Sequence, residues 1–295
     1  MSATPFDQRD GWIWYDGQLV PWKEANLHVL SHGLHYGSSV FEGERAYGGV
    51  IFKSTRHSER LKRSAQILDF EIPYSAAEID AAKRLVLEKN GMTDAYLRPV
   101  AWRGSEMMGV AAQHNRIHLA IACWEWPSYF DPAQKMKGIR ICMADYRRPD
   151  PATAPSAAKA AGLYMICTIS KHRAERNGYA DALMLDWQGR VAECTGANVF
   201  FVKDGVVHTP IADCFLDGIT RQTVIELAKR RGLEVAQRRI MPEEMAGFQE
   251  CFITGSAAEV TPVAEVGPYT FTPGNITRIL MDDYTAEVQP KAKAA

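Results

Sequence analysis

Lys159 lies among small residues in the segment "PSAAKAAGLY", residues 155–164, and Tyr164 follows five positions later. A lysine is most often a surface charge, but alanine and glycine neighbours allow a flat ring to lie close to the backbone. A lysine amine that is withdrawn from water has a lowered pKa and can act as nucleophile and base near neutral pH. The segment therefore predicts a lysine that condenses with an aldehyde to form a Schiff base.

A pyridoxal phosphate aldehyde would need further groups besides Lys159. A carboxylate must keep the pyridine nitrogen protonated, and Glu193 in "VAECTGANVFF" is the candidate. The phosphate needs backbone N–H groups, ideally at a helix N-terminus, and a nearby arginine. Residues 218–220 in "LDGITRQTVIELA" and residues 255–258 in "FITGSAAEVTP" are candidate loops, and Arg56 in "STRHSERL" is the candidate arginine. Each piece also has a purely structural interpretation, so the residues alone give the cofactor as a hypothesis.

Three histidines recur in "HVLSHGLHYG", where His28, His32 and His35 stand at i, i+4 and i+7. The spacing raises the hypothesis of a metal site, but H-E-x-x-H is absent and no acidic residue lies close by as a further ligand. We therefore interpret them as structural histidines in a tight loop and expect no metal. The patterns G-x-x-x-x-G-K-[ST], G-x-G-x-x-G and G-x-S-x-G are also absent from the sequence.

The composition is that of an ordinary globular protein with balanced charge. The 295 residues include 34 Lys and Arg against 35 Asp and Glu, a net charge of -1, so we expect neither a nucleic acid nor a membrane partner. Six cysteines are scattered without a C-x-x-C pair, which is typical of reduced, buried thiols. The start, "MSATPFDQRD", has no apolar signal segment, and no apolar run reaches membrane-spanning length. These features predict a soluble, cytoplasmic protein.

The first half of the chain reads as antiparallel strands with two helices. Asp16-Gly17 and Gly48-Gly49 mark tight turns between short strands. Helical spacing covers 54–70, and 75–91 begins with a Ser75–Glu78 capping box and ends at Gly91. Strands are predicted over 95–102 and 117–126. The segment 126–138, with two prolines and no clear period, is the candidate linker, so we expect an N-terminal α+β domain over 1–125 and a C-terminal domain over 139–295 that carries Lys159.

The second half is also a mixture of strands and helices. Strands are predicted over 139–146, 180–186, 191–193, 198–210 and 250–256, with turns at Gln188-Gly189 and Asp204-Gly205; helices are predicted over 162–178, 219–232 and 275–284. Both halves together predict a mixed α+β and α/β fold.

The order of the motifs closely resembles the branched-chain amino acid aminotransferases, which are fold-type IV pyridoxal phosphate enzymes. The resemblance runs from about residue 10 to the last helix. It rests on "HGLHYGSSVFEGERAY", "RHSERLKRSA", "AYLRPVAWRG", "AAKAAGLY", "NGYADALMLD", "AECTGANVFFVKDGVVHTP", "DGITRQTVIELA" and "FITGSAAEVTPV". It implies a two-domain architecture with the cofactor between the domains.

The resemblance also implies roles around the cofactor, pyridoxal 5'-phosphate. Lys159 would be the aldimine lysine and the proton shuttle. Glu193 would pair with the pyridine nitrogen, and Tyr164 would hydrogen-bond the ring hydroxyl. The phosphate would be held by Arg56, Ile219, Thr220 and Ser256.

The substrate-binding residues follow from the same resemblance. Tyr96 and the backbone of Ser256, Ala257 and Ala258 would bind the α-carboxylate, Arg98 would receive the side-chain carboxylate of glutamate or 2-oxoglutarate, and Phe41, Trp126 and Tyr129 would form the apolar pocket. Aromatic walls suit aliphatic side chains, at about 0.8 kcal/mol per buried methylene. Tyr36 and Val110 would reach across from a partner subunit, which implies a homodimer with a shared site, either alone or within a larger assembly.

We therefore predict a transaminase that moves amino groups between L-leucine, L-isoleucine or L-valine and 2-oxoglutarate by a ping-pong mechanism. Alternatives on the same scaffold are a D-amino acid or (R)-amine aminotransferase and an aminodeoxychorismate lyase. A non-catalytic α+β binding protein is an alternative of another class. The sequence departs from the family pattern at Ser256 and Cys194, and the charged Arg103 and Glu106 lie near the expected substrate loop.

Overall fold

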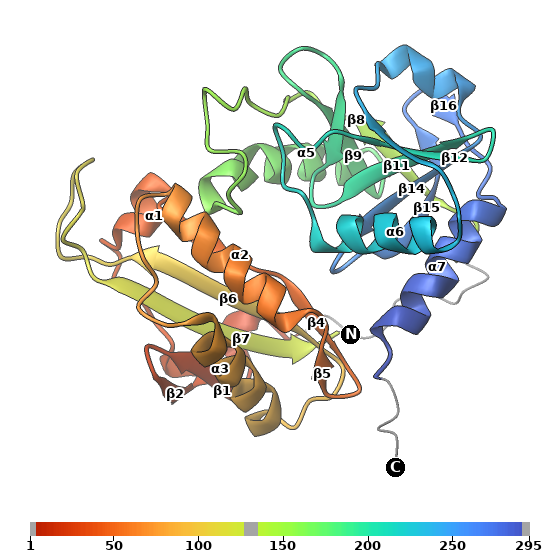
Figure 1. Ribbon diagram of the computed structural model, residues 1–295. Coiled ribbons are helices and arrows are strands. Elements are labelled where there is room, and N and C mark those ends of the chain that lie inside the picture. The colour runs from red at the N-terminus through yellow and green to blue at the C-terminus, as the bar shows by residue number, and fades with distance from the viewer. Residues whose placement is uncertain (1–3, 127–134, 291–295) are drawn as a thin grey trace. The chain divides into compact units, whose positions relative to one another are not determined.

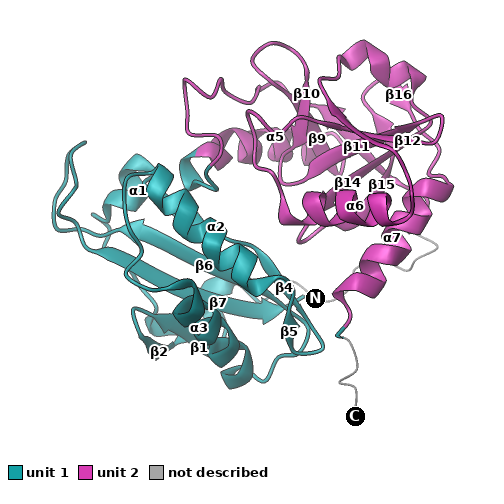
Figure 2. Ribbon diagram, viewed as in Figure 1, with its two compact units in different colours: residues 1–127, 158–162, 290–295 teal, residues 128–157, 163–289 magenta. Residues whose placement is uncertain are grey.

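The computed structural model describes residues 4–126 and 135–290, and its contacts divide the chain into two compact units (Figure 2). Unit 1 comprises residues 1–127, 158–162 and 290–295, and unit 2 comprises residues 128–157 and 163–289. Residues 127–134 of the predicted linker 126–138 lie outside the described residues. Each unit has a sheet and an apolar core of its own.

Unit 1 is built on an antiparallel sheet (Figure 1). Its strands are β1 (Trp12–Tyr15), β2 (Gln18–Pro21), β3 (Ser39–Phe41), β4 (Glu44–Tyr47), β5 (Val50–Ile51), β6 (Ala95–Arg103) and β7 (Ile117–Glu125). The order is β2-β1-β7-β6-β4-β5, and β3 also pairs with β6. Asp16 and Gly17 have φ of 48° and 97°, as the predicted tight turn between β1 and β2 requires.

Two predicted helices of unit 1 are confirmed and one short helix was not predicted. Helices α2 (Ser54–Ile67) and α3 (Ala76–Lys89) lie on one face of the sheet (Figure 1), and α3 begins with the predicted capping box. The unpredicted helix is α1 (His32–Tyr36), which lies where the sequence indicated a tight loop and ends at Gly37 with φ 65°. The unit's core is a cluster of apolar side chains from these helices and strands, among them Leu61, Ile79, Val86, Leu97 and Leu119.

The segment 158–162 belongs to unit 1 by its contacts, whereas the sequence placed Lys159 in the predicted C-terminal domain. Ala160 forms an antiparallel bridge with Val40, and the N–H of Phe41 donates to the carbonyl of Lys159 over 3.1 Å. The segment therefore extends the edge of strand β3. Sequence position did not indicate this, because the pairing joins residues more than a hundred positions apart.

Unit 2 has a mixed sheet that closes on itself. Its strands are β8 (Ile139–Met143), β9 (Asp181–Leu185), β10 (Val191–Cys194), β11 (Asn198–Lys203), β12 (Val206–Pro210), β13 (Val235–Arg238), β14 (Glu250–Gly255), β15 (Glu259–Val266) and β16 (Tyr269–Thr270). The order is β10-β9-β8-β15-β14-β11-β12-β13, with β16 on β15, and β10 also pairs with β11. This last pairing joins the sheet into a ring. Strands β13, β15 and β16 were not predicted.

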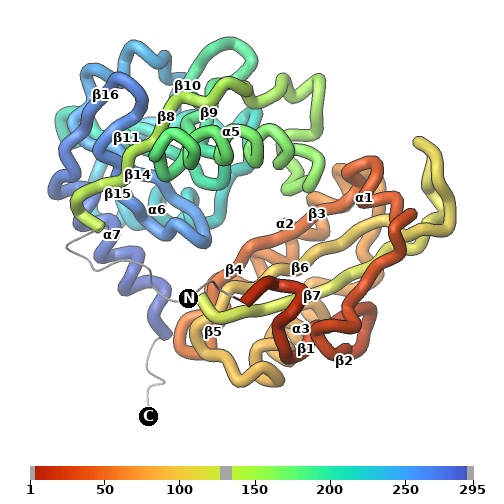
Figure 3. The backbone as a smooth tube through the Cα atoms, turned by 180° about the vertical axis from the view of Figure 1, so that it is seen from behind, coloured from red at the N-terminus to blue at the C-terminus, as the bar shows by residue number. Residues whose placement is uncertain are grey.

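In the described part of unit 2, three α-helices cover the sheet. They are α5 (Met165–Arg176), α6 (Ile219–Arg230) and α7 (Asn275–Val288), and each falls within or over its predicted range. Helix α5 packs on β9, as Figure 3 shows from behind, while α6 and α7 contact each other and the strands β14 and β15. Short 3-10 helices are Phe6–Gln8, Trp22–Glu24, Ala161–Tyr164 and Pro242–Gly247.

The cysteines agree with the prediction of reduced thiols. All six are free, and all but Cys142 are buried.

Among residues 4–126 and 135–290, the helices all lack the length and apolarity that a bilayer crossing requires.

Candidate active site

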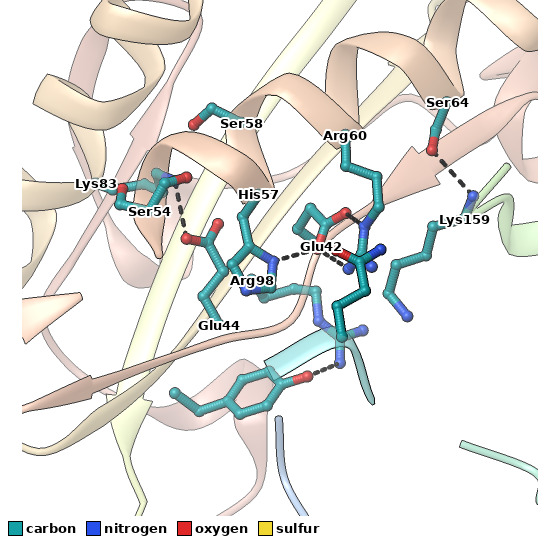
Figure 4. A network of polar contacts seen from close by, with 12 residues as sticks. Glu42, Glu44, Ser54, His57, Ser58, Arg60, Ser64, Lys83, Arg98 and Lys159 are labelled. Atoms are coloured by element: carbon teal, nitrogen blue, oxygen red, sulfur yellow. Dashed lines mark hydrogen bonds and ion pairs between the residues drawn. The ribbon is translucent and has the colours of Figure 1, made fainter. Parts of the chain in front are cut away.

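Lys159 is held in unit 1 by its backbone and directs its amine over an aromatic ring. Its N–H donates to Oγ of Ser64 on α2 over 3.0 Å, and its carbonyl accepts from Phe41. Its Nζ atom lies 4.7 Å from the centroid of the Phe41 ring. Figure 4 shows the side chain extending from the Ser64 contact toward the side chains of Arg60 and Arg98. The predicted nucleophile therefore has a fixed backbone.

Arg98 lies against the same aromatic ring. Its guanidinium carbon is 4.7 Å from the centroid of Phe41 and 5.4 Å from that of Tyr96. Its Nη2 donates to the hydroxyl of Tyr96 over 3.2 Å, while its buried Nε has no hydrogen-bond partner in the described residues. The structure thus brings together three predicted substrate residues, Phe41, Tyr96 and Arg98, beside Lys159.

Tyr96 is itself fixed by aromatic stacking. Its ring centroid is 5.0 Å from that of Trp124 and 5.1 Å from that of Trp126. A Cβ atom at Gly43 would lie 2.0 Å from the Tyr96 hydroxyl, so the glycine makes room for it. Predicted residue Trp126 therefore joins the group, and predicted residue Tyr129 lies outside the described residues.

Three further predicted residues of unit 1 lie on its surface. Arg56 is exposed on α2, and Val110 is 89% exposed in the loop between β6 and β7. Tyr36 is half-exposed at the end of α1 and stacks on His32, with ring centroids 4.4 Å apart.

The histidines and charged residues that raised other hypotheses have structural contacts. The ring nitrogens of His32 contact Ser38 Oγ and the carbonyl of Gly109, at 2.7 and 2.8 Å. Arg103, which the sequence placed near the substrate loop, is buried on β6 and donates to main-chain carbonyls, including that of Ala112. Glu106 accepts from the N–H of Arg116. Arg103 therefore supports the loop main chain, and its guanidinium is committed to carbonyl oxygens.

Glu193 is the predicted acid of unit 2 and lies buried on β10. Its Oε1 is 3.4 Å from Nε of Arg148, and its Oε2 accepts from Nδ2 of Asn198 over 3.2 Å. Arg148 also donates to Sγ of Cys167 on α5. Burial works to lower the pKa of Arg148, but the nearby Glu193 carboxylate outweighs it and raises that pKa. Tyr164 caps α5 and is half-buried.

Asn198 connects Glu193 to the predicted phosphate loop. Its Nδ2 also donates to the carbonyl of Leu216, just before α6, and a Cβ atom at Gly218 would lie 2.3 Å from its Oδ1. Gly218 is the N-cap of α6 and makes no side-chain cap. The first N–H groups of the helix, at Ile219 and Thr220, have no acceptor within the helix itself. The sequence analysis missed Asn198, although its place in "TGAN", directly after Glu193 and Cys194, was an available signal.

The second predicted loop lies against the same strands. Asn198 pairs with Thr254 between β11 and β14, and Ser256, Ala257 and Ala258 form the turn that follows β14. A Cβ atom at Gly255 would lie 3.3 Å from the carbonyl oxygen of Gly196. Unit 2 thus gathers a carboxylate, a helix N-terminus and a small-residue turn around one asparagine.

Comparisons with known proteins show the family to which the chain belongs. A family model described as "Amino-transferase class IV" matches residues 39–266. The branched-chain-amino-acid aminotransferase of Pseudomonas aeruginosa is 42% identical over 262 residues, covering 88% of this chain and 85% of its own, and that of Escherichia coli is 40% identical, with 86% and 84% covered. The solved T.th. branched-chain amino acid aminotransferase complexed with N-(5'-phosphopyridoxyl)-L-glutamate has a TM-score of 0.90 at 38% identity, covering 95% of this chain and 94% of that one. With a fold-type IV structure in two units and a family match over most of its length, the chain belongs to the class IV aminotransferases.

Proposed function

We propose that this protein is a pyridoxal phosphate-dependent aminotransferase that moves the amino group between L-branched-chain amino acids and 2-oxoglutarate. The observation that carries the proposal is the arrangement of Lys159 and Arg98 on the single ring of Phe41. An amine and a carboxylate-binding group are thereby placed beside one apolar surface. The names of the relatives support the branched-chain substrate, and the phosphopyridoxyl-L-glutamate bound to the T.th. enzyme supports both the cofactor and L-glutamate.

The residues of this chain fit the chemistry of pyridoxal phosphate. Glu193 is a buried carboxylate that can face a protonated ring nitrogen; Arg148 forms an ion pair with it, and Asn198 donates a hydrogen bond to it. The uncapped N-terminus of α6 offers N–H groups for a phosphate. We assign Ile219, Thr220, Ser256 and Arg56 to the phosphate and Tyr164 to the ring hydroxyl. Both the charge and the donor set therefore suit the cofactor.

Lys159 is proposed to carry the proton of the reaction. The bound cofactor withdraws electrons from the substrate α-carbon, which makes its proton removable. The Nζ atom of Lys159 would remove that proton from the α-carbon as a general base and then deliver it, as a general acid, to the carbon that comes from the cofactor aldehyde. The hydrogen bonds of the Lys159 backbone hold the main chain from which this amine extends. Glu193 keeps the ring nitrogen protonated while the charge develops.

The substrate pocket is proposed to accept both an aliphatic and an acidic side chain. Phe41, Trp126 and Tyr129 would cover the aliphatic side chain, while Tyr96 and the turn with Ala257 and Ala258 would bind the α-carboxylate. Arg98 already stacks on aromatic rings, so its charge is accommodated when the substrate is apolar. When 2-oxoglutarate binds, the same guanidinium pairs with its distal carboxylate.

We further propose a homodimer, in which Tyr36 and Val110 complete the partner's site. Unit 1 exposes apolar side chains near α1, including Val29 at 67% and Leu34 at 64%. Leu34 also borders an apolar cavity of about 570 Å³ in the same unit. Apolar surface of this kind commonly marks a contact with another chain.

The six free cysteines suit a reducing compartment, and a cytoplasmic location is proposed on that ground.

The proposal is tested with the purified protein and pyridoxal phosphate. We expect a visible absorbance band that L-leucine bleaches and 2-oxoglutarate restores. The Lys159→Ala variant should lose both the band and the bleaching. Lys53→Ala is the matched control, because Nζ of Lys53 lies 5.5 Å from the Phe52 ring centroid in the same unit. Turnover that survives in Lys159→Ala would refute the assignment.

The enantiomer of the amino donor separates the alternatives. Bleaching by D-leucine or by an (R)-amine in place of L-leucine would favour the other aminotransferases of this scaffold. Release of pyruvate from aminodeoxychorismate would favour the lyase. The Pseudomonas and Escherichia relatives do not favour these alternatives, and membership of an aminotransferase family argues against the non-catalytic binding protein.

A further inference from the structure

Lys159 owes its position to two different elements of unit 1. Its N–H is bound by Ser64 on helix α2, and its carbonyl is bound by Phe41 at the end of strand β3. Neither contact involves the lysine side chain. A change in the distance between α2 and β3 therefore strains or breaks one of the two hydrogen bonds and displaces the backbone from which the amine extends.

A buried ion cluster joins these same two elements. Glu42 follows Phe41 directly and is fully buried. Its Oε1 accepts from Nε of Arg60, its Oε2 accepts from Nη2 of Arg60, and His57 Nδ1 contacts Oε2, each at 2.7 Å. Arg60 and His57 both belong to α2, and the Arg60 side chain is only 8% exposed. The cluster therefore fixes the end of β3 to the helix.

The position of the cluster along α2 matches that of the Lys159 contact. Arg60 and Ser64 are four residues apart, so they lie on the same face of the helix, one turn apart. Figure 4 shows Glu42, Arg60, Ser64 and Lys159 following one another across this face. The main chain of Glu42 is fixed as well, because its N–H donates to the carbonyl of Pro99 on β6 over 2.9 Å.

Glu42 keeps its charge in this environment. Burial would raise the pKa of its carboxyl group, but the charges and hydrogen bonds of Arg60 and His57 outweigh burial and hold the pKa well below its usual range. Replacing a buried carboxylate in such a cluster leaves its cationic partners without their counter-charge. The cluster is therefore a permanent ion pair.

We propose that Glu42, with Arg60 and His57, is the positioning device that holds α2 and β3 at the separation required by the Lys159 backbone. The device acts through Ser64 and Phe41, and Glu42 itself need not touch the cofactor or the substrate. The meaning of this device for catalysis rests on the proposed function of Lys159, whereas its effect on the backbone does not.

Glu44 provides a matched control two residues away. It is also fully buried and bound to a cation, because Lys83 Nζ donates to its Oε2 over 2.8 Å. Lys83 comes from α3 and also donates to the carbonyl of Ser54, at the start of α2. These contacts are separate from the two hydrogen bonds that Ser64 and Phe41 make to the Lys159 backbone. Glu44→Gln thus tests the loss of a buried carboxylate without the proposed link.

The first experiment measures amide hydrogen exchange in the full-length protein. We expect Glu42→Gln to raise the exchange rate of the Lys159 and Phe41 amides by at least about tenfold, since loss of a charge-assisted hydrogen bond has about that effect on a local equilibrium. Glu44→Gln should change these two amides by less than about threefold after correction for the global stability of each variant. Equal exchange in the two variants would overturn the proposal.

The second experiment measures covalent labelling of the holoenzyme by borohydride. The initial rate at which a pyridoxyl group becomes attached to Lys159 should fall in Glu42→Gln and stay near the wild-type rate in Glu44→Gln. If the wild-type protein attaches no pyridoxyl group, the proposed function fails, while the exchange experiment still decides the role of Glu42. An unchanged labelling rate in Glu42→Gln would contradict the proposal that the cluster positions Lys159 for its reaction with the cofactor.

Two milder variants keep the proposal testable if Glu42→Gln does not fold. Arg60→Lys keeps the charge but replaces a two-point contact by one ammonium, and Ser64→Ala removes only the acceptor of the Lys159 N–H. Both should accelerate exchange of the Lys159 amide, and Arg60→Lys should also accelerate that of Phe41. No acceleration in either variant would refute the link between the cluster and Lys159.

Discussion

Asn198 is bound to Glu193 through a hydrogen bond of 3.2 Å from Nδ2 to Oε2, and the same Nδ2 also donates to the carbonyl of Leu216. One side chain thus supports both the predicted ring-nitrogen partner and the approach to helix α6. The resemblance to the family did not predict either of these roles for Asn198. It is the natural first target for mutation in unit 2.

Asn198→Ala should destabilise the protein by about 1–3 kcal/mol, because a buried carboxylate and a carbonyl lose their donor. The affinity for pyridoxal phosphate should fall by about tenfold, which corresponds to roughly 1.4 kcal/mol. Urea unfolding and a fluorescence titration with the cofactor measure the two effects. Asn177→Ala is the control, since Asn177 Nδ2 makes an exposed contact to the carbonyl of Arg173 and should change stability by less than about 0.5 kcal/mol. Equal effects of both variants would contradict the role of Asn198.

Arg98→Met should impair the half-reaction with 2-oxoglutarate and leave that with L-leucine nearly unchanged. The guanidinium is needed for the distal carboxylate of 2-oxoglutarate, so KM for this substrate should rise by about tenfold to a hundredfold. The half-reaction with L-leucine should change by less than about threefold, because methionine retains an apolar side chain over Phe41. Stopped-flow absorbance measures each half-reaction. Arg140→Met removes an exposed ion pair with Glu265 in unit 2 and serves as the control. An equal loss of activity with 2-oxoglutarate and with L-leucine would contradict the proposed role of Arg98.

Gly43→Ala should displace Tyr96, because the added Cβ would lie 2.0 Å from the hydroxyl. We expect a loss of about 1–3 kcal/mol in unfolding free energy, as for other overpacked sites. In a Tyr96→Phe background the same change should cost less, since the clashing oxygen is gone. Urea unfolding of the wild type, both single variants and the double variant gives the coupling. Strict additivity would show that the glycine serves some other purpose.

Asp80 should make the free energy of unfolding depend on pH in the acid range. Burial works to raise the pKa of its carboxyl group, but hydrogen bonds from Ser58, Thr55 and Ser54, and the charge of Lys83, outweigh it and lower the pKa to about 2. A carboxyl group whose pKa is lower in the folded than in the unfolded protein stabilises the fold at pH values above its unfolded pKa, about 4. This stabilisation is lost as the pH falls through the folded pKa, about 2.

Asp80→Asn should therefore be less stable than the wild type at neutral pH. The difference in unfolding free energy should shrink between pH about 4 and about 2. Urea unfolding at a series of pH values measures it. A difference that stays constant over this range would show that the hydroxyl contacts are equally good with the amide.

The sequence was sufficient for most elements because their signals are local. The turn at Asp16-Gly17, the Ser75–Glu78 capping box and the apolar period of α2 each depend on residues within a few positions of one another. Helix α1 was missed because it has only five residues, too few for a period to appear. Strand β15 was missed because Pro262 interrupts its pattern.

The contacts that organise the site could not be predicted in this way. Lys159 meets Ser64 over a sequence separation of 95, and Glu42 meets Arg60 over 18. The charged Glu42 directly after Phe41 in "VFEGERAY" was the available signal, because a buried carboxylate requires a partner. The identity of that partner depends on the packing of α2 on the sheet, which no local pattern contains. Lys159 itself was found because its small neighbours and the family motif are local.

The assignment of residues 158–162 to unit 1 has a consequence for synthesis. A polypeptide that is still growing on the ribosome can form the helices and most of the sheet of unit 1 early, but the edge of β3 has no strand to pair with until the lysine segment emerges. The acceptor for the N–H of Phe41 is then missing. Nascent chains halted before residue 158 should therefore be more easily cut by protease near Phe41 than chains halted shortly after residue 162 has left the exit tunnel.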